Sequence, residues 1–598
     1  MQMKINLSKE QEKIVNFEDG PILVKAGPGS GKTRVLIERI KRLLLSKARV
    51  KILALTFSNL AAEEMSDRIQ EDPNLEEKMD NVWVGTIHSF CLDMLQTRGY
   101  LIGLSDNLVL FESLEDRKKL LSEAMLKEPR LKQILLSVDK KDQFLSNCLT
   151  MIADYKKGFV SVDSSDIESE MSLIYRAYNE QLLLQGAIDF DDILFYAYRI
   201  LSENPNVVKL YNTQYRYICV DEAQDLNFAQ YSVIKALCGD NFNNIMLVGD
   251  ENQSIYGFNG SDSDLMSRAF VVDFKPTVFV LNENFRSAKA IVNYANTLEE
   301  SSGVPNCYYE GELSAFGFDS EADEAVHVVE KILDLIRNGH PDIESNIKYE
   351  DIAVIARNKY AFQTLEASLS NAEIPYCMKK TAAGIESESE MFKVFDLELR
   401  LVANPKDILH ARELQGIMNQ SDNVEVLSTI HNIVQDISID AFDLKRVLLK
   451  IKTLVNNLTT SDEEKYLLLN DCDLWLRHWV KYTAQVPSEN RTLVSFRNYV
   501  SLGKTQIVEN NDGVTLLTAH MSKGLQYEVV FVIGLCEGTF PDYRAVQSEK
   551  AMEQEKNNMY VAVTRAKRLC YLSYPRLKKM PWGDLKIQRP SRFITNLL

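Results

Sequence analysis

Short runs of β-branched and other apolar residues recur along the chain, and each is followed by a turn and then by a helical pattern. The runs are 22–26, 52–56, 217–220, 245–248, 278–281, 352–356, 514–518 and 529–533. Strands that alternate with helices in this way are typical of parallel sheets covered by helices on both faces. The pattern therefore predicts an α/β fold built on doubly wound parallel sheets.

Two long stretches, 88–188 and 376–512, lack such runs and follow a helical spacing instead. In the second stretch, Phe392, Phe395 and Leu399 recur at the i, i+3, i+7 spacing of an amphipathic helix. Each stretch interrupts a series of predicted strands, so the sequence predicts two α/β cores, each with one mainly helical insertion. The expected bounds are 1–87 and 189–283 for the first core, 88–188 for its insertion, 284–375 and 513–598 for the second core, and 376–512 for its insertion.

Composition limits the class of protein. Apolar residues make up 45% of the chain and charged residues 26%, which is typical of a globular protein that dissolves in water. No run approaches the roughly 18 apolar residues that a membrane helix requires, and the first residues lack the apolar stretch of a secretory signal. We therefore expect a cytoplasmic protein without a membrane partner.

Charge and cysteine content bear on two questions: whether the chain can bind nucleic acid, and whether it holds a metal cluster. The formal net charge is −17, yet a nucleic-acid site needs only a local positive lining, so a nucleic-acid partner is not excluded. The two closest of the nine cysteines, Cys219 and Cys238, lie 19 residues apart, so the chain has no CxxC motif. An iron–sulfur cluster or a zinc finger is therefore not expected, and we expect buried reduced thiols instead.

A glycine-rich segment follows the first predicted strand and precedes a helical pattern. The segment is Ala26-Gly27-Pro28-Gly29-Ser30-Gly31-Lys32-Thr33. It matches a phosphate-binding loop, except that Ala26 stands where the general pattern has glycine. Backbone N–H groups of such a loop close around phosphates at a helix N-terminus, Lys32 would neutralise the β- and γ-phosphates, and Thr33 would hold Mg²⁺. Because Gly-Lys-Thr follows a strand, a loop that binds ATP with Mg²⁺ is favoured over a loop that is only a turn.

Two adjacent acids follow the predicted strand 217–220. They are Asp221 and Glu222, and the carboxyl ends of strands are where α/β sheets bind ligands. Asp221 would coordinate Mg²⁺, and Glu222 would orient and deprotonate the attacking water. On their own, such acids are often a solvated loop or a helix cap, but together with the phosphate loop they favour an NTPase.

The order of further motifs resembles that of the UvrD/Rep/PcrA-type superfamily 1A DNA helicases, from Leu7 to about Lys567. The matching runs are 56–59 with 61–65, 85–90, 189–192, 249–256, 284–287, 514–520 with 523–525, and 560–567. Each run alone is a weak signal, whereas all of them in this order are specific. The resemblance implies two RecA-like cores with ATP between them, 3′→5′ movement along single-stranded DNA, and unwinding of tailed duplex DNA.

The resemblance also implies residues that bind the nucleoside. Gln11 matches a glutamine that reads the adenine, although Ser8 to Gln11 also fit a capping box, and both roles can coexist at a helix start. Arg34 and Phe285 fall where the family sandwiches the adenine ring, and a guanidinium and an aromatic face suit such stacking. Gln526 replaces a glutamate near the ribose, and its amide can still bond a hydroxyl.

Three further residues match family positions that couple hydrolysis to movement. Gln253 matches a sensor of the γ-phosphate between the cores, and Arg286 and Arg565 match arginine fingers from the second core. Such arginines stabilise the charge of the transferring phosphoryl group and contribute about 10³–10⁵ in rate. Hydrolysis would then require the two cores to close on each other.

A last set of residues resembles the family's track for single-stranded DNA: Phe57, Thr86, His88, Tyr256, Phe258, Thr518 and His520. Stacking of bases on aromatic rings tolerates any sequence, which suits a translocating motor, and the two threonines would bond backbone phosphates. Aromatic residues in strands are more often part of a core, so the assignment depends on the resemblance.

Departures from the family leave a second function open. Asn259 stands where the family usually has arginine, 556–558 replaces a more basic stretch, and 376–512 lacks the family's Gly-Ile-Gly signature. The rival hypothesis is a DNA-responsive ATPase subunit that regulates a partner nuclease, as UvrD-like proteins do in Gabija-like anti-phage defence. Unwinding of a 3′-tailed duplex by the purified chain would separate the two hypotheses.

Overall fold

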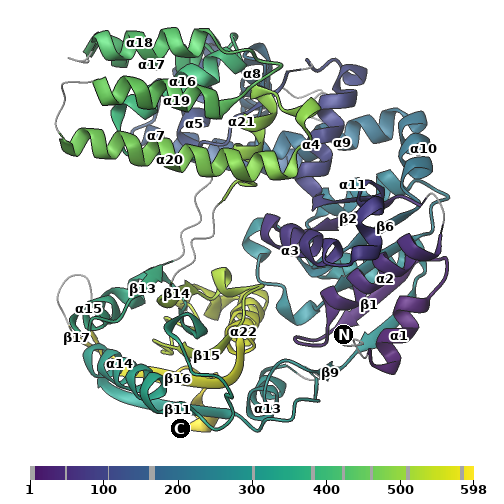
Figure 1. Ribbon diagram of the computed structural model, residues 1–598, viewed down its shortest axis with the longest axis vertical. Helices are drawn as coiled ribbons and strands as arrows, with labels where there is room; N and C mark the ends of the chain where they lie inside the picture. The colour runs from purple at the N-terminus through teal and green to yellow at the C-terminus, as the bar shows by residue number, and fades with distance from the viewer. Residues whose placement is uncertain are drawn as a thin grey trace.

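The computed structural model describes residues 7–47, 50–105, 107–159, 169–299, 303–378, 384–420, 424–457, 462–506, 512–579 and 585–598. These residues form two mainly parallel sheets with helices on their faces, and two groups of helices that lie together at one end of the molecule (Figure 1). The predicted α/β class, with two parallel-sheet cores and long helical stretches between their strands, is confirmed.

Six parallel strands form the first sheet, in the order β3-β2-β6-β7-β1-β8. Their bounds are β1 Ile22–Ala26, β2 Ile52–Thr56, β3 Val82–Thr86, β6 Tyr217–Val220, β7 Ile245–Gly249 and β8 Thr277–Leu281. All but β3 coincide with predicted runs to within one residue. Gly85 interrupts the apolar pattern of β3, because glycine has no side chain to pack on a sheet.

Helices cover both faces of the first sheet. Their bounds are α1 Lys9–Asn16, α2 Lys32–Ser46, α3 Asn59–Gln70, α4 Ile87–Arg98, α9 Phe190–Glu203, α10 Pro205–Gln214, α11 Phe228–Cys238 and α12 Phe270–Phe274. Within β1, Leu23 packs with α4, α9 and α11, whereas Ile22 and Val24 pack with α1 and α2. Successive side chains of a strand point to opposite faces, so a nearly continuous apolar strand suits a sheet that is buried on both sides.

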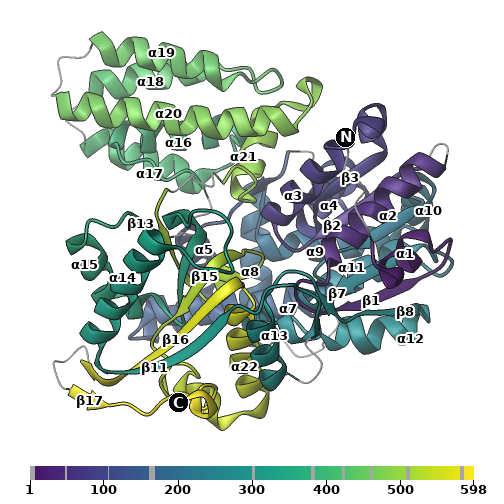
Figure 2. The same ribbon diagram turned by 60° about the horizontal axis from the view of Figure 1, so that its bottom comes forward.

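The second sheet has six parallel strands in the order β11-β16-β15-β12-β14-β13, and β17 pairs antiparallel with β16. The strands are β11 Glu312–Ser320, β12 Ile352–Ala356, β13 Tyr376–Met378, β14 Val514–Thr518, β15 Tyr527–Val532, β16 Ala566–Lys579 and β17 Leu585–Ile587. The covering helices are α13 Lys289–Leu298, α14 Glu321–Asn338, α15 Gln363–Asn371 and α22 Glu549–Val563. Helices α13 and α22 pack on one face, and α14 and α15 on the other (Figure 2).

Two groups of helices, each with its own apolar core, interrupt the two sheets. The first group is α5 Leu114–Lys127, α6 Pro129–Ser137, α7 Lys141–Lys157 and α8 Glu170–Leu184; the second is α16 Glu390–Ala403, α17 Ile408–Gln420, α18 Val424–Gln435, α19 Leu444–Asn457, α20 Asp462–Gln485 and α21 Leu493–Ser501. Helix α4 crosses the expected boundary at 87/88 and packs on the first sheet. No helix among the described residues is long and apolar enough to cross a membrane.

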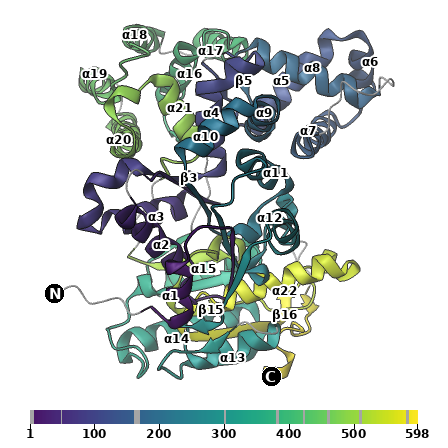
Figure 3. The same cartoon turned by 90° about the vertical axis from the view of Figure 1, so that its right-hand side faces the viewer.

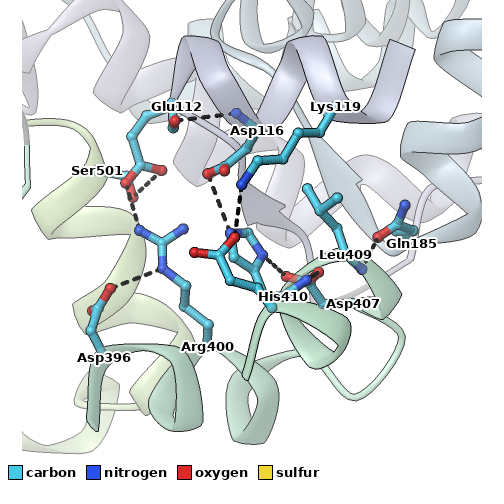
Figure 4. A network of polar contacts seen from close by, with 12 residues as sticks. Glu112, Asp116, Lys119, Gln185, Asp396, Arg400, Asp407, Leu409, His410 and Ser501 are labelled. Atoms are coloured by element: carbon cyan, nitrogen blue, oxygen red, sulfur yellow. Dashed lines mark hydrogen bonds and ion pairs between the residues drawn. The ribbon is translucent and has the colours of Figure 1, made fainter. Parts of the chain in front are cut away.

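Buried and half-buried polar side chains join the two groups of helices, which lie side by side (Figures 3 and 4). Arg400 of α16 forms an ion pair with Glu112 at 3.3 Å. His410 of α17 lies between Asp407, at 2.6 Å, and Asp116 of α5, at 3.2 Å. Burial opposes the charge of His410, but the hydrogen bonds to Asp116 and Asp407 outweigh it and raise its pKa to about 9. The helices of the second group are therefore docked on the first group.

Candidate active site

The glycine-rich segment forms a tight loop between β1 and α2, as its sequence predicts. Gly29 and Gly31 have φ angles of 68° and 85°, in the left-handed region that favours glycine. The Ser30 hydroxyl donates to the Gly27 carbonyl at 2.7 Å and closes the loop. Among the described residues, no side chain caps helix α2, which begins at Lys32, so its first N–H groups are available to an anion. The other loop residues, Ala26 and Pro28, are buried.

Lys32 carries a buried charge beside this loop. Its Nζ atom lies 3.8 Å from Asp250 Oδ2 and makes no hydrogen bond within the part of the chain that the structure describes. A buried ammonium group without a hydrogen-bond partner is costly, and a phosphate oxygen would supply that partner. The residues of the loop therefore fit the triphosphate of ATP.

Thr33, Asp221 and Glu222 meet next to Lys32. Thr33 Oγ1 donates to Asp221 Oδ2 at 3.1 Å. Burial and the neighbouring Glu222 carboxylate raise the pKa of Asp221 to about 7. Burial also opposes ionisation of Glu222, but Lys32 and Lys523 outweigh it and hold the pKa of Glu222 below its ordinary value. A hydroxyl beside a carboxylate fits Mg²⁺, which prefers oxygen ligands, and the ionised Glu222 fits a general base.

The backbone of Glu222 is also unusual. Its φ angle is 52°, which places this residue in the left-handed region at the end of β6. A non-glycine residue in that region is strained and persists only where the surrounding structure enforces it. Such strain is frequent at functional sites, and it agrees with the catalytic role predicted for Glu222.

The residues predicted to bind adenine are brought together in part. Gln11 and Phe285 line one pocket, which also includes Ser8. Gln11 is buried, completes the capping box with Ser8, and donates from Nε2 to the phosphate-loop backbone at 2.9 Å. A role for Gln11 in the capping box is therefore compatible with a role in binding adenine. The described residues that line this pocket do not include Arg34, in the first turn of α2, or Gln526, which is exposed just before β15.

Two arginines of the second core, Arg286 and Arg565, lie close to the phosphate loop and to Gln253 of the first core. Phe285 N donates to the Gly29 carbonyl at 3.0 Å, and a Cβ atom on Gly29 would lie 2.7 Å from Arg286 Cβ. Arg565 is buried, and its Nη2 lies 3.5 Å from Gln253 Oε1. Burial and the charge of Arg286 lower the pKa of Arg565 to about 9, and burial lowers that of Arg286 as well. Two cations held together in a buried site favour an anionic ligand.

A row of side chains connects Lys32 to Arg565 across the two cores. Asp250 Oδ2, which faces Lys32, accepts a hydrogen bond from Gln253 Nε2 at 2.6 Å. The Oε1 atom of the same glutamine faces Arg565. Gln253 therefore contacts groups of both cores, as a sensor of the γ-phosphate between them requires. Asp250 was not among the predicted site residues, although it lies inside the matching run 249–256.

Lys523 is a second residue of this site to which the sequence assigns no individual role. Its buried Nζ forms an ion pair with Asp225 Oδ2 at 2.5 Å, donates to the Gln253 carbonyl, and lies 5.3 Å from the centre of the Tyr256 ring. A buried lysine nearly always has an acidic partner, but Asp225 is too distant in the sequence to be recognised as that partner. Lys523 thus contacts both Gln253, which lies near Lys32, and Tyr256, which lies in the aromatic cluster described next.

Phe57, Tyr256, Phe258 and His520 form one aromatic cluster that includes both cores. The Phe57 and Tyr256 rings stack with centroids 4.9 Å apart, and His520 lies 5.4 Å from Phe258. Phe258 is 74% exposed, so its face is open to a nucleic-acid base. Burial and the charge of Arg357 lower the pKa of His520 to about 4, which keeps its ring neutral near pH 7.

The other residues predicted to bind DNA make separate contacts. The His88 ring lies 4.5 Å from Phe190, and burial lowers the pKa of His88 to about 4. Thr86 caps α4, because its hydroxyl accepts from the Ser89 N–H at 3.2 Å. Thr518 is the last residue of β14. Roles for these three residues in binding DNA stay predictions.

Comparison with known proteins agrees with this geometry. The family model of the UvrD/REP helicase N-terminal domain matches residues 7–271, and that of the UvrD-like helicase C-terminal domain matches residues 279–473 and 415–576. The ATP-dependent DNA helicase PcrA of Staphylococcus aureus (strain NCTC 8325 / PS 47) is 29% identical over 660 residues, which cover 99% of this chain and 86% of the relative. PcrA of Staphylococcus epidermidis (strain ATCC 12228) is 29% identical over 662 residues, with the same coverage. The chain therefore belongs to the UvrD-like helicases and has their two RecA-like cores.

Proposed function

We propose that this chain is an ATP-dependent DNA helicase that moves 3′→5′ on single-stranded DNA and unwinds tailed duplexes. One observation supports the proposal most: Gln253 and Tyr256 lie three residues apart on one segment, and residues of the second core contact both of them. Arg565 contacts Gln253, and Lys523 contacts the ring of Tyr256. Gln253 lies between Lys32 and Arg565, and Tyr256 belongs to the aromatic cluster. Nucleotide and DNA would therefore act on one short piece of backbone.

At the nucleotide end, each residue has a chemical role. Lys32 would neutralise the phosphates, and Thr33 and Asp221 would hold Mg²⁺, which when bound neutralises charge that develops on the phosphate oxygens. Glu222, kept ionised by nearby lysines, would orient water and accept its proton. Arg565 would bring the charge of the second core to the transferring phosphoryl group, so hydrolysis requires the cores to be closed.

At the DNA end, the aromatic cluster would stack bases without regard to sequence. Phe57 and Tyr256 belong to the first core, and His520 to the second, so a change in the distance between the cores shifts one part of the track against the other. In this proposal the motor cores are 1–87 with 189–283 and 284–375 with 513–598, and their insertions are 88–188 and 376–512.

Strand separation on two substrates tests the proposal. We expect the purified chain with ATP and Mg²⁺ to separate a fluorescently labelled duplex that carries a 3′ single-stranded tail, and not one with a 5′ tail. Lys32→Ala is the control for ATP dependence. Separation of the 5′-tailed duplex alone would contradict the direction. DNA-stimulated ATP turnover with no separation of either duplex would favour the alternative of a subunit that regulates a partner nuclease.

A further inference from the structure

Helix α22 of the second core lies along the segment 253–257 of the first core. Asn557 Nδ2 donates to the Ser254 carbonyl at 3.1 Å. One turn earlier on the same helix face, the Gln554 amide fills the space beside Gly257, where a Cβ atom would lie only 1.6 Å from Gln554 Nε2. The two contacts are three residues apart on α22 and three residues apart on the segment. The helix and the segment therefore lie alongside each other and run in opposite directions.

The same helix also delivers the arginine that faces the γ-phosphate sensor. Arg565 follows the end of α22, is tied to it by a hydrogen bond from Nε to the Val561 carbonyl at 2.9 Å, and faces Gln253 Oε1. A shift of α22 relative to the segment therefore changes the Arg565–Gln253 contact and the Asn557 contact at once.

The hydrogen bond of Asn557 depends on the contact between the two cores. It is 7% exposed in the middle of a helix, and an amide that is buried without hydrogen bonds is costly. The Ser254 carbonyl that accepts its hydrogen bond belongs to the other core. The hydrogen bond therefore exists only when α22 is seated on the segment, and it fixes the peptide that lies between Gln253 and Tyr256.

We propose that Asn557, together with Gln554, is a positioning residue that couples the aromatic cluster to the nucleotide site. It acts by holding the Ser254 peptide so that a base on Tyr256 changes the placement of Gln253 relative to Arg565. This inference rests on the proposed function, because it requires that DNA stimulates ATP hydrolysis.

The test compares ATP turnover in Asn557→Ala with that in the parent chain across a series of poly-dT concentrations. Loss of the donor should lower the DNA-stimulated kcat about fivefold, which corresponds to a net hydrogen bond of about 1 kcal/mol. The poly-dT concentration that gives half-maximal stimulation should stay within about twofold, because the stacking residues are intact. A role in structure alone would not separate these two quantities in this way.

Two further variants sharpen the test. Gly257→Ala displaces the Gln554 amide without changing Asn557, so it should also lower the stimulated kcat. It carries the test if Asn557→Ala does not fold, as judged by thermal unfolding. Lys556→Ala is the matched control on the same helix, because Lys556 pairs with Glu299 within the second core at 2.9 Å, and it should leave the stimulated kcat unchanged.

The outcomes separate the inference from the proposed function. If poly-dT does not stimulate the parent chain, the proposed function fails. If it does, and Asn557→Ala and Gly257→Ala keep full stimulation, the coupling role is overturned while the proposed function stands. A higher half-maximal poly-dT concentration with unchanged kcat would place Asn557 in DNA binding, which also overturns the inference.

Discussion

His410 is expected to hold the two groups of helices together through its charge. Its protonated ring donates to Asp407 at 2.6 Å and to Asp116 of the first group at 3.2 Å (Figure 4). The preceding residue, Leu409, is buried among the apolar side chains of the first group. His410→Ala leaves the two carboxylates without their shared cation, and removal of one partner from a buried charged cluster is strongly destabilising.

The size of the effect follows from the pKa of His410. A rise from 6.5 to about 9 corresponds to about 3 kcal/mol of stabilisation by the protonated ring. Because the pKa is higher in the folded state than in the unfolded state, this contribution is complete below about pH 6.5 and is lost as the pH rises through about 9. The part of the difference in unfolding free energy between the parent and His410→Ala that depends on protonation should therefore be about 3 kcal/mol at pH 6 and mostly gone at pH 9.5.

Urea unfolding followed by tryptophan fluorescence measures this difference. Two of the four tryptophans, Trp475 and Trp479, are buried in the apolar core of the second group of helices, so part of the fluorescence change reports on that group. His431→Ala is a matched control, because His431 is half exposed and bonds Glu398 within the same group. A cost for His410→Ala that is the same at both pH values, or no larger than that of His431→Ala, would refute the reasoning.

Four changes at the candidate site have distinct expected results. Lys32→Ala should abolish ATP turnover, because it removes the cation that pairs with the phosphates. Glu222→Gln should still bind a fluorescent ATP analogue but not cleave ATP; equal loss of binding in both variants would contradict the role of Glu222. Arg565→Ala should lower kcat about 10³-fold or more with a much smaller effect on nucleotide affinity, measured by steady-state kinetics. Alanine at both Tyr256 and Phe258 should reduce poly-dT stimulation more than basal turnover, and full stimulation in that double variant would disprove their place in the track.

Most strands of the first sheet, and β12, β14 and β15 of the second, could be predicted because their signal is local, whereas β11, β13, β16 and β17 were not among the predicted runs. Runs such as those at β1 and β12 are nearly continuous in apolar residues and short, which is what a strand buried on both faces requires. Strand β3 was not predicted, because Gly85 interrupts its apolar pattern. Helix α4 crosses an expected boundary, because helical periodicity does not reveal which core a helix packs on.

The contacts that join the two cores could not be predicted in this way. The partners Lys523 and Asp225 lie far apart in the sequence, as do Asn557 and Ser254, and neither pair follows a periodic pattern. The family resemblance predicted Gln253 as a site residue, yet only the fold shows its contact with Arg565. Sequence therefore predicted candidate residues for the chemistry, whereas it gave no signal for the residues that connect them across the two cores.

ATP turnover by the purified chain, with and without a poly-dT oligonucleotide, tests the central claim most directly. The account predicts a clear rise in turnover on addition of the oligonucleotide, because Tyr256 of the aromatic cluster lies on the same short segment as Gln253. The rise should disappear in Lys32→Ala, where no turnover remains. Turnover by the parent chain that is the same with and without the oligonucleotide would contradict the account.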